Sequence, residues 1–337
     1  MARALERLLR RRRRGNAIFC RVLLCLCAVT LVIALPRLVA SFRAFGAFLQ
    51  YAFIRRAFIG GVVIALCASL LGVILVLKQY SMIGDGLSHV GFGALTIAYA
   101  LAAVTTDTLP DTLPSGLRNG IATLCASIAA EPLPFTLVIV VVCAIALLAR
   151  GGRVRGGDAS IAILPTGALA VGVIVSSTVK GLNIDVTNAM FGSILAMGET
   201  DVKLSVALSL MVLAVFILLY PRIFAVTFDE PFAQATGINA RGVNLMISVL
   251  TAVTVVVGMR IMGTMLISSL IILPAVTAMH LFSRFRSVML ASAILSVLCF
   301  ALGLMLSCLC SLPAGAGIVI VDLAADALFT IIEGARS

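Results

Sequence analysis

The stretch SMIGDGLSHVGFGALTIAYAL, residues 81–101, places an acid and an imidazole inside an apolar segment long enough to cross a membrane. Asp85 and His89 are four residues apart, so a helix puts them on one face, and Phe92, Thr96 and Tyr99 continue that face. An ionisable group at bilayer depth costs about 2.5–3.5 kcal/mol, so it normally faces a bundle interior or an aqueous path. Asp85 and His89 are therefore the first candidates for functional residues.

The donor atoms of this pair suit a metal ion. A carboxylate oxygen beside an imidazole nitrogen is a ligand combination that accepts divalent first-row metals such as Mn, Zn or Fe(II). Two ligands hold a metal poorly, so the others must come from elsewhere in the bundle, from a second copy of the chain or from water. A hydrogen-bonded Asp–His pair that joins two helices is the alternative, and the residues alone leave both readings open.

The composition indicates a membrane protein. Hydrophobic residues make up 62% of the 337 residues and charged residues only 12%, far from the balance of a soluble globule. Apolar runs bounded by charge, Gly or Pro predict an all-α polytopic protein with about eight to ten transmembrane helices, some of them short or re-entrant. The formal charge of +11 fits arginine-rich cytoplasmic loops that face anionic membrane lipid, and nucleic-acid binding explains it poorly.

The order of these runs suggests a division of the chain. Residues 1–16 read as a basic cytoplasmic arm and residues 17–44 as an additional N-terminal transmembrane helix. Residues 45–332 form the main transmembrane domain, and residues 333–337 a tail. Within the domain, the proline-containing segment 105–134 is expected to be an extracytoplasmic insertion, and the stretches 119–130 and 186–197 are short for a span.

Residues 227–242, TFDEPFAQATGINARG, predict one short helix in a cytoplasmic loop. An acid can cap its first turn, proline suits that turn and glycine suits its end. Phe232 is a large apolar side chain among small ones, as in docking elements, although an ordinary helical loop would look similar. The residues proposed for docking are Asp229, Glu230, Pro231, Phe232, Ala233 and Gly237.

The sequence contains no P-loop for ATP hydrolysis. A phosphate-binding P-loop ends in Gly-Lys-Ser/Thr, whereas Lys78, Lys180 and Lys203 each follow a residue other than glycine. We therefore expect a transport subunit and not an enzyme, with any work supplied by a separate protein.

Five ordered motifs together resemble the permease subunits of manganese/zinc/iron ABC transporters, over roughly residues 49–332. The arm, the first helix and the long 105–134 segment depart from that pattern. The matching stretches are LGVILVLKQYSMIGDGLSHVGFGALTIAYAL (71–101), GGDASIAILPTGALAVGVIV (156–175), NIDVTNAMFGSILAMGETDV (183–202), FDEPFAQATGIN (228–239) and MRIMGTMLISSLIILPAVTA (259–278).

The resemblance implies an ABC importer permease in the cytoplasmic membrane of a bacterium. It implies partners: an ATP-binding subunit, an extracytoplasmic metal-binding lipoprotein and a second permease copy, identical or paralogous. Asp85 and His89 match the family's GD-x-x-SH motif, whose acid and histidine coordinate metal, and the loop helix matches the element seated in the ATPase. The cargo would be Mn, Zn or Fe, with no permanently bound cofactor.

Other functions are weighed against the same residues. A permease for a metal chelate or siderophore would need no inner-sphere ligands, so the Asp85/His89 pair speaks against it. A non-ABC channel or carrier would lack an ATPase partner. An intramembrane metalloenzyme would need more metal ligands, because the sequence contains only two histidines and no H-E-x-x-H motif.

Overall fold

The computed structural model describes residues 50–80, 82–101, 115–151, 157–178, 192, 199–310 and 312–336. The expected basic arm and first helix (1–44), and most of the stretch 186–197, lie outside these residues. The described part is helical and contains no strand, as the sequence predicts. Its helices are α2 (Ala52–Leu77), α3 (Met82–Ala100), α4 (Ser115–Ala130), α5 (Pro132–Gly151), α6 (Gly157–Thr178), α8 (Glu199–Phe228), α9 (Glu230–Ala235), α10 (Ala240–Met262), α11 (Thr264–Leu281), α12 (Phe285–Cys310) and α13 (Ala314–Arg336).

The described helices include six that are long and apolar enough to cross a membrane, namely α2, α8, α10, α11, α12 and α13. A seventh is possible if α4 and α5, bent by 88° at their junction, count as one span. Helices α3 and α6 lie in the same bundle but fall short of this test. The chain is therefore a multi-pass membrane protein.

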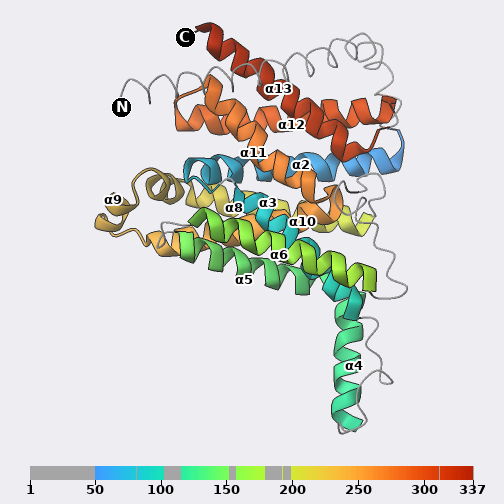
Figure 1. Ribbon diagram of the computed structural model, residues 1–337. Helices are drawn as coiled ribbons and strands as arrows, with labels where there is room; N and C mark the ends of the chain where they lie inside the picture. The colour runs from blue at the N-terminus through green and yellow to red at the C-terminus, as the bar shows by residue number, and fades with distance from the viewer. Residues whose placement is uncertain are drawn as a thin grey trace, which may run out of the picture.

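Helix α2 occupies the centre of the bundle, with α11, α12 and α13 on one side and α5 and α6 on the other (Figure 1). Small residues on α2 let α12 approach closely, and the Phe300 ring occupies the space over Gly61. The Ser296 hydroxyl donates to the Ala65 carbonyl at 2.9 Å. Small residues and interhelical hydrogen bonds of this kind are how helices associate without a hydrophobic driving force in lipid.

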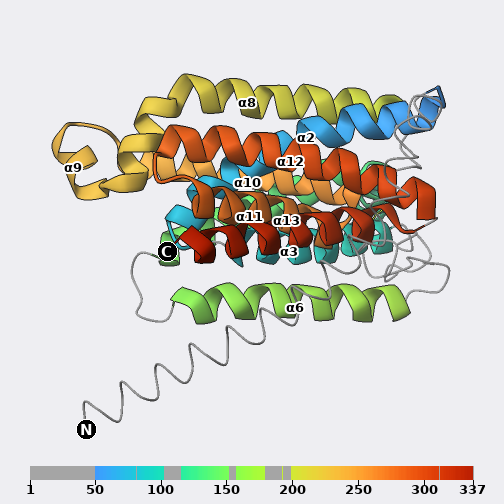
Figure 2. The same ribbon diagram turned by 90° about the horizontal axis from the view of Figure 1, so that it is seen from above.

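Contacts between described helix ends mark the two opposite ends of the bundle. At one end Glu230 of α9 contacts Lys78 at the end of α2, and the Phe285 ring at the start of α12 contacts the rings of Phe224 and Phe228 of α8. Helix α9 stands out from this end in both views (Figures 1 and 2). Arg56 and Glu199, 3.6 Å apart, lie at the other end.

Helix α3 is packed among α5, α6, α10 and α11. It starts at the end of the bundle that carries α9, because only residues 78–81 connect it to α2. At its far end α4 extends away from the bundle, so most of the segment expected as an exposed insertion is one 16-residue helix (Figure 1).

Candidate metal site

The structure brings the two predicted ligands together at the start of α3. Asp85 lies in the first turn of the helix, and its Oδ2 is 3.6 Å from Nε2 of His89 one turn later. The Asp85 side chain is 50% exposed and that of His89 19%. The pair therefore lies near the α9 end of the bundle, on a face that one copy of the chain leaves partly open.

The second imidazole nitrogen of His89 is buried among the described residues. His89 Nδ1 is buried and makes no hydrogen bond within the described residues, and a buried polar atom left unpaired costs free energy. Groups of three or more His, Cys, Asp or Glu side chains able to hold a metal are also absent from those residues. The described part of one chain therefore offers two ligands at this position.

The remainder of the predicted polar face divides into a covered part and an open part. Phe92 and Thr96 are buried, and the Thr96 hydroxyl donates to the Phe92 carbonyl at 2.8 Å. The Phe92 ring packs over Gly172 of α6, where an added Cβ would lie only 2.9 Å from it. Tyr99 is exposed. Helix α6 thus covers the middle of the face, while Asp85 and His89 remain accessible.

The short loop helix forms as the sequence predicts. One Asp229 carboxylate oxygen accepts a hydrogen bond from the Phe232 backbone N–H at 2.9 Å and caps the helix, and Pro231 occupies its first turn. Gly237 ends it with φ of +84°, and the bonds from Gly237 N to Gln234 O and from Ile238 N to Ala233 O, both 3.0 Å, complete a Schellman motif. Glycine adopts this left-handed conformation without strain.

Helix α9 presents one large apolar side chain to its surroundings. Phe232 is 64% exposed, whereas Ala233 is fully buried against the bundle. A single exposed aromatic residue on a rigid, capped helix is a suitable anchor for another protein. The docking role of α9 remains a prediction.

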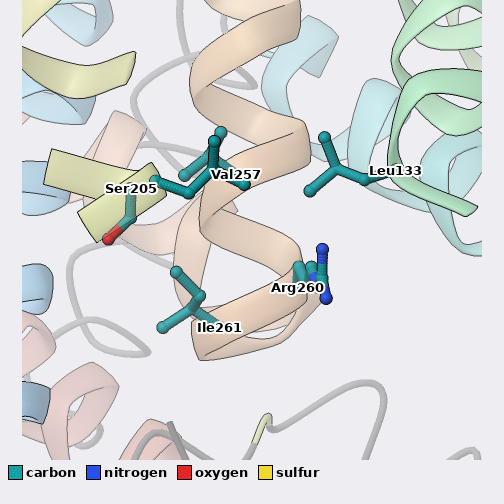
Figure 3. Close-up of a pocket in the computed structure, with 6 residues that line it drawn as sticks. Leu133, Ser205, Val257, Arg260 and Ile261 are labelled. Carbon is teal, nitrogen blue, oxygen red and sulfur yellow. The ribbon is translucent and has the colours of Figure 1, made fainter. Parts of the chain in front are cut away.

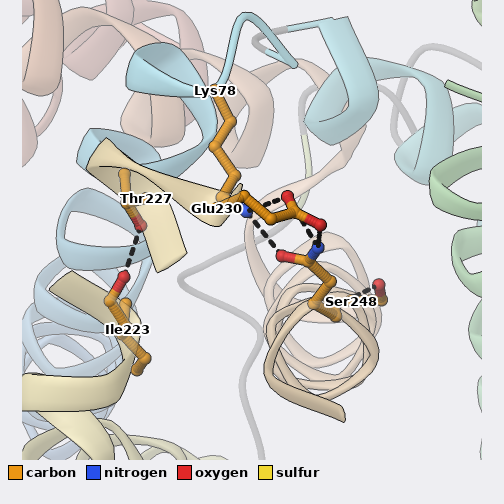
Figure 4. Close-up of polar contacts among 6 residues, drawn as sticks. Lys78, Ile223, Thr227, Glu230 and Ser248 are labelled. Atoms are coloured by element: carbon orange, nitrogen blue, oxygen red, sulfur yellow. Dashed lines mark hydrogen bonds and ion pairs between the residues drawn. The ribbon is translucent and has the colours of Figure 1, made fainter. Parts of the chain in front are cut away.

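A polar cluster that the sequence did not suggest joins α9 to the rest of the bundle (Figure 4). Lys78 at the end of α2 lies 3.9 Å from Oε2 of Glu230 and donates to the Asn244 side-chain oxygen in α10. Asn244 Nδ2 in turn donates to both Glu230 oxygens at 3.3 Å. Burial lowers the pKa of Lys78, and the Glu230 charge offsets part of that change.

A small hollow lies between the first turns of α5 and α8 and the last turns of α10 (Figure 3). Its lining is mostly apolar, and the Arg260 side chain borders it. Neither Asp85 nor His89 borders this hollow, so it is separate from the candidate metal site. Its lining residues are Leu133, Leu204, Ser205, Val257, Arg260 and Ile261.

Comparisons of this chain with a family model, with related sequences and with solved structures agree with one another. The model of the ABC 3 transport family matches residues 50–332. The manganese transport system membrane protein MntC of Halalkalibacterium halodurans is 26% identical over 287 residues, covering 85% of this chain and 88% of that protein. A probable metal transport system membrane protein of Treponema pallidum is 31% identical over 260 residues, covering 77% and 87%. The structure of PsaBC from Streptococcus pneumoniae in complex with Fab superposes with a TM-score of 0.66 at 23% identity, covering 87% of this chain and 95% of that one, which shows a shared fold.

Proposed function

The chain belongs to the ABC 3 transport family, and from this premise we propose that it is the membrane permease subunit of an ATP-driven importer of a divalent transition metal. Manganese, zinc and Fe(II) all accept oxygen and nitrogen donors such as those of Asp85 and His89, so these donors are compatible with all three metals. The relatives named for manganese or metal transport support this class of cargo.

The observation that carries the proposal is the pair Asp85 and His89. Both side chains are partly exposed on one face of α3, and His89 keeps a buried ring nitrogen without a partner. A carboxylate and an imidazole can replace part of the hydration shell of a divalent ion. Without a thiolate the site should bind the ion weakly enough to release it, as conduction requires.

A second copy of the chain would complete the ion site. In a twofold dimer with the open faces of α3 at the seam, each copy contributes one Asp85 and one His89, which gives four ligands about the axis. Such a dimer would also cover the exposed Asp85 side chain. A paralogous permease with equivalent residues would serve the same purpose.

The remaining proposed partners are suggested by membership of the ABC 3 transport family. We propose that an ATPase subunit docks on Asp229, Glu230, Pro231, Phe232, Ala233 and Gly237, and that an extracytoplasmic lipoprotein delivers the metal at the opposite end. ATP-driven movement of α9 would then open the central site alternately to each side. The arm 1–16 and the helix 17–44 would precede a transport domain, residues 45–332, that lies in the cytoplasmic membrane of a bacterium and contains the segment 105–134 as an extracytoplasmic insertion.

A chelate permease is the main competing function, and the two ligands argue against it because a complexed metal needs no inner-sphere donors from the protein. Metal-resolved uptake by proteoliposomes that contain the permease, its ATPase and its binding protein tests the choice. We expect Asp85→Ala and His89→Ala each to reduce uptake of the free ion by at least about tenfold, as loss of a metal ligand or its support typically does.

The other histidine of the chain provides a matched control. His280 lies at the end of α11 and contacts Glu333 of α13, away from α3. His280→Ala should leave uptake close to that of the wild type. Wild-type uptake in both the Asp85 and His89 variants would remove these residues from the transport path, and uptake of a chelate instead of the free ion would reject the proposed cargo.

A further inference from the structure

The polar cluster of Lys78, Glu230 and Asn244 connects three helices that meet at one end of the bundle. Lys78 is the C-cap of α2, Glu230 starts α9, and Asn244 lies in the second turn of α10. Its side chains share one ion pair and three hydrogen bonds (Figure 4). We call this cluster the α9 clasp.

The clasp holds the C-cap residue of α2, just before the turn that leads into α3. Only residues 78–81 separate α2 from α3, and backbone hydrogen bonds stiffen this turn, from Tyr80 N to Leu75 O at 2.7 Å and from Ile83 N to Tyr80 O at 3.0 Å. Gln79 has φ of +62°, an uncommon conformation for a residue with a side chain. A displacement of Lys78 is therefore passed to the first turn of α3, which carries Asp85.

Among the described residues, a second route from α9 to α3 leads through α10, which packs against both helices. The peptide backbone leads from α9 back into α8 and forward into α10. The only buried residue of α9 is Ala233. The side-chain bridge from Glu230 to Lys78 differs from that route because it joins the loop helix to the turn before α3 itself.

The burial of the cluster suggests a purpose beyond stability. The Lys78 side chain is only 9% exposed and that of Glu230 42%. Taking a charged pair out of water often costs as much free energy as the pair returns, so well-packed apolar residues could replace it at little cost to stability. A directional, charged contact instead fixes the relative position of two elements.

We propose that Lys78, Glu230 and Asn244 are positioning residues that transmit displacement of α9 to the start of α3 and so to Asp85 and His89. This inference rests on the proposed function, because it assigns to the clasp the transfer of work from a docked ATPase to the metal ligands. It predicts that breaking the clasp separates ATP hydrolysis from metal movement.

The test measures two rates in one preparation. Proteoliposomes that contain the permease, its ATPase and its binding protein are assayed for metal uptake and ATP hydrolysis, and the number of metal ions moved per ATP is compared. Lys78→Met and Glu230→Gln should lower this ratio at least about fivefold, the low end of couplings measured between distant sites. The charge-swapped double variant Lys78→Glu/Glu230→Lys should recover much of the ratio, since the Asn244 amide can donate or accept.

Lys203→Met is the matched control, because Lys203 also pairs with a glutamate, Glu199 at 2.9 Å, but at the opposite end of the bundle. Its ratio should stay within about twofold of wild type, since exposed pairs contribute little. A wild-type complex that moves no metal overturns the proposed function itself. A wild-type complex that transports while Lys78→Met keeps the normal ratio overturns the clasp alone. Equal losses of uptake and ATP hydrolysis in Lys78→Met, with the ATPase no longer bound, also overturn it in favour of a docking or folding role.

Discussion

Replacing Gly72 with alanine is expected to force α2 and α11 apart. An added Cβ at this position would lie 1.8 Å from the carbonyl oxygen of Ile271 and 2.8 Å from its carbonyl carbon. Ordinary van der Waals contact begins at 3.4 Å, so the two backbones must separate locally by roughly 1.6 Å, the difference between 3.4 and 1.8. Overpacking of this kind costs about 1–3 kcal/mol, and a clash with backbone belongs at the upper end because no side chain can rotate away.

The displaced residue also contacts α3. The side chain of Ile271 covers Gly84, where an added Cβ would lie 3.1 Å from its Cδ1 atom, and Gly84 immediately precedes Asp85. Because interiors are close-packed, movement of α11 at this point is transmitted to its neighbours. Gly72→Ala should therefore reduce metal uptake as well as stability.

The assay is thermal unfolding of the purified protein in detergent. A loss of about 3 kcal/mol corresponds to a decrease in Tm of about 5 °C for a protein of this size. Gly167→Ala in α6 is the control, because no atom lies within 4 Å of its added Cβ; alanine there can gain up to about 1 kcal/mol of helix propensity. A Gly72→Ala protein as stable as Gly167→Ala would refute the close approach of α2 and α11.

Two further predictions concern the α9 end of the bundle. Phe232→Ala should weaken co-purification of the ATPase by about tenfold or more, the loss typical of an aromatic anchor, whereas Phe53→Ala, also exposed but near the start of α2, should not; equal retention in both would remove Phe232 from the interface. Burial holds the pKa of Lys78 below its ordinary 10.5, with Glu230 opposing the change, so the folded protein releases this proton at lower pH than the unfolded chain. The free energy of unfolding should accordingly rise as the pH increases from the folded-state pKa of Lys78 towards 10.5. The difference in Tm between the wild type and Lys78→Met should therefore increase over this pH range. A difference in Tm that does not change with pH would contradict the burial of the Lys78 charge.

Local chemistry explains which parts of the fold the sequence could predict. The α9 helix is encoded within nine residues by an acidic cap, a first-turn proline and a terminal glycine, and it forms between Asp229 and Gly237 as expected. The helical spacing of Asp85 and His89 likewise requires only the period of an α-helix. The family resemblance, drawn from the ordered motifs, is confirmed by the family match.

Contacts between distant segments left no such signal. Lys78 and Asn244 are 166 residues apart, and a lysine next to an apolar run looks like an ordinary membrane-interface residue. The sequence did not show whether the stretch 119–130 spans the membrane, because length and hydropathy do not determine the direction in which a helix runs. The structure makes this stretch part of α4, which is bent by 88° from α5. The sequence also could not show which part of the polar face of α3 is covered. That depends on the position of α6, which no local sequence feature determines.

The first turns of α3 and its later turns pack against different helices. Its later turns are locked to α6, since an added Cβ at Gly93 would lie 2.6 Å from the Ala168 carbonyl oxygen, and Phe92 is wedged over Gly172. Asp85 and His89 come earlier, about 4.5 and 10 Å along the helix from Met82 at 1.5 Å per residue. The first two turns contact α11 instead, where Ile271 lies against Gly84, so a force applied at Lys78 would act on them before it acts on the turns packed against α6. Under the proposed function, tilting so short a segment would change the positions of Asp85 and His89 together, so a small movement of α9 would alter how the two copies of this pair hold an ion.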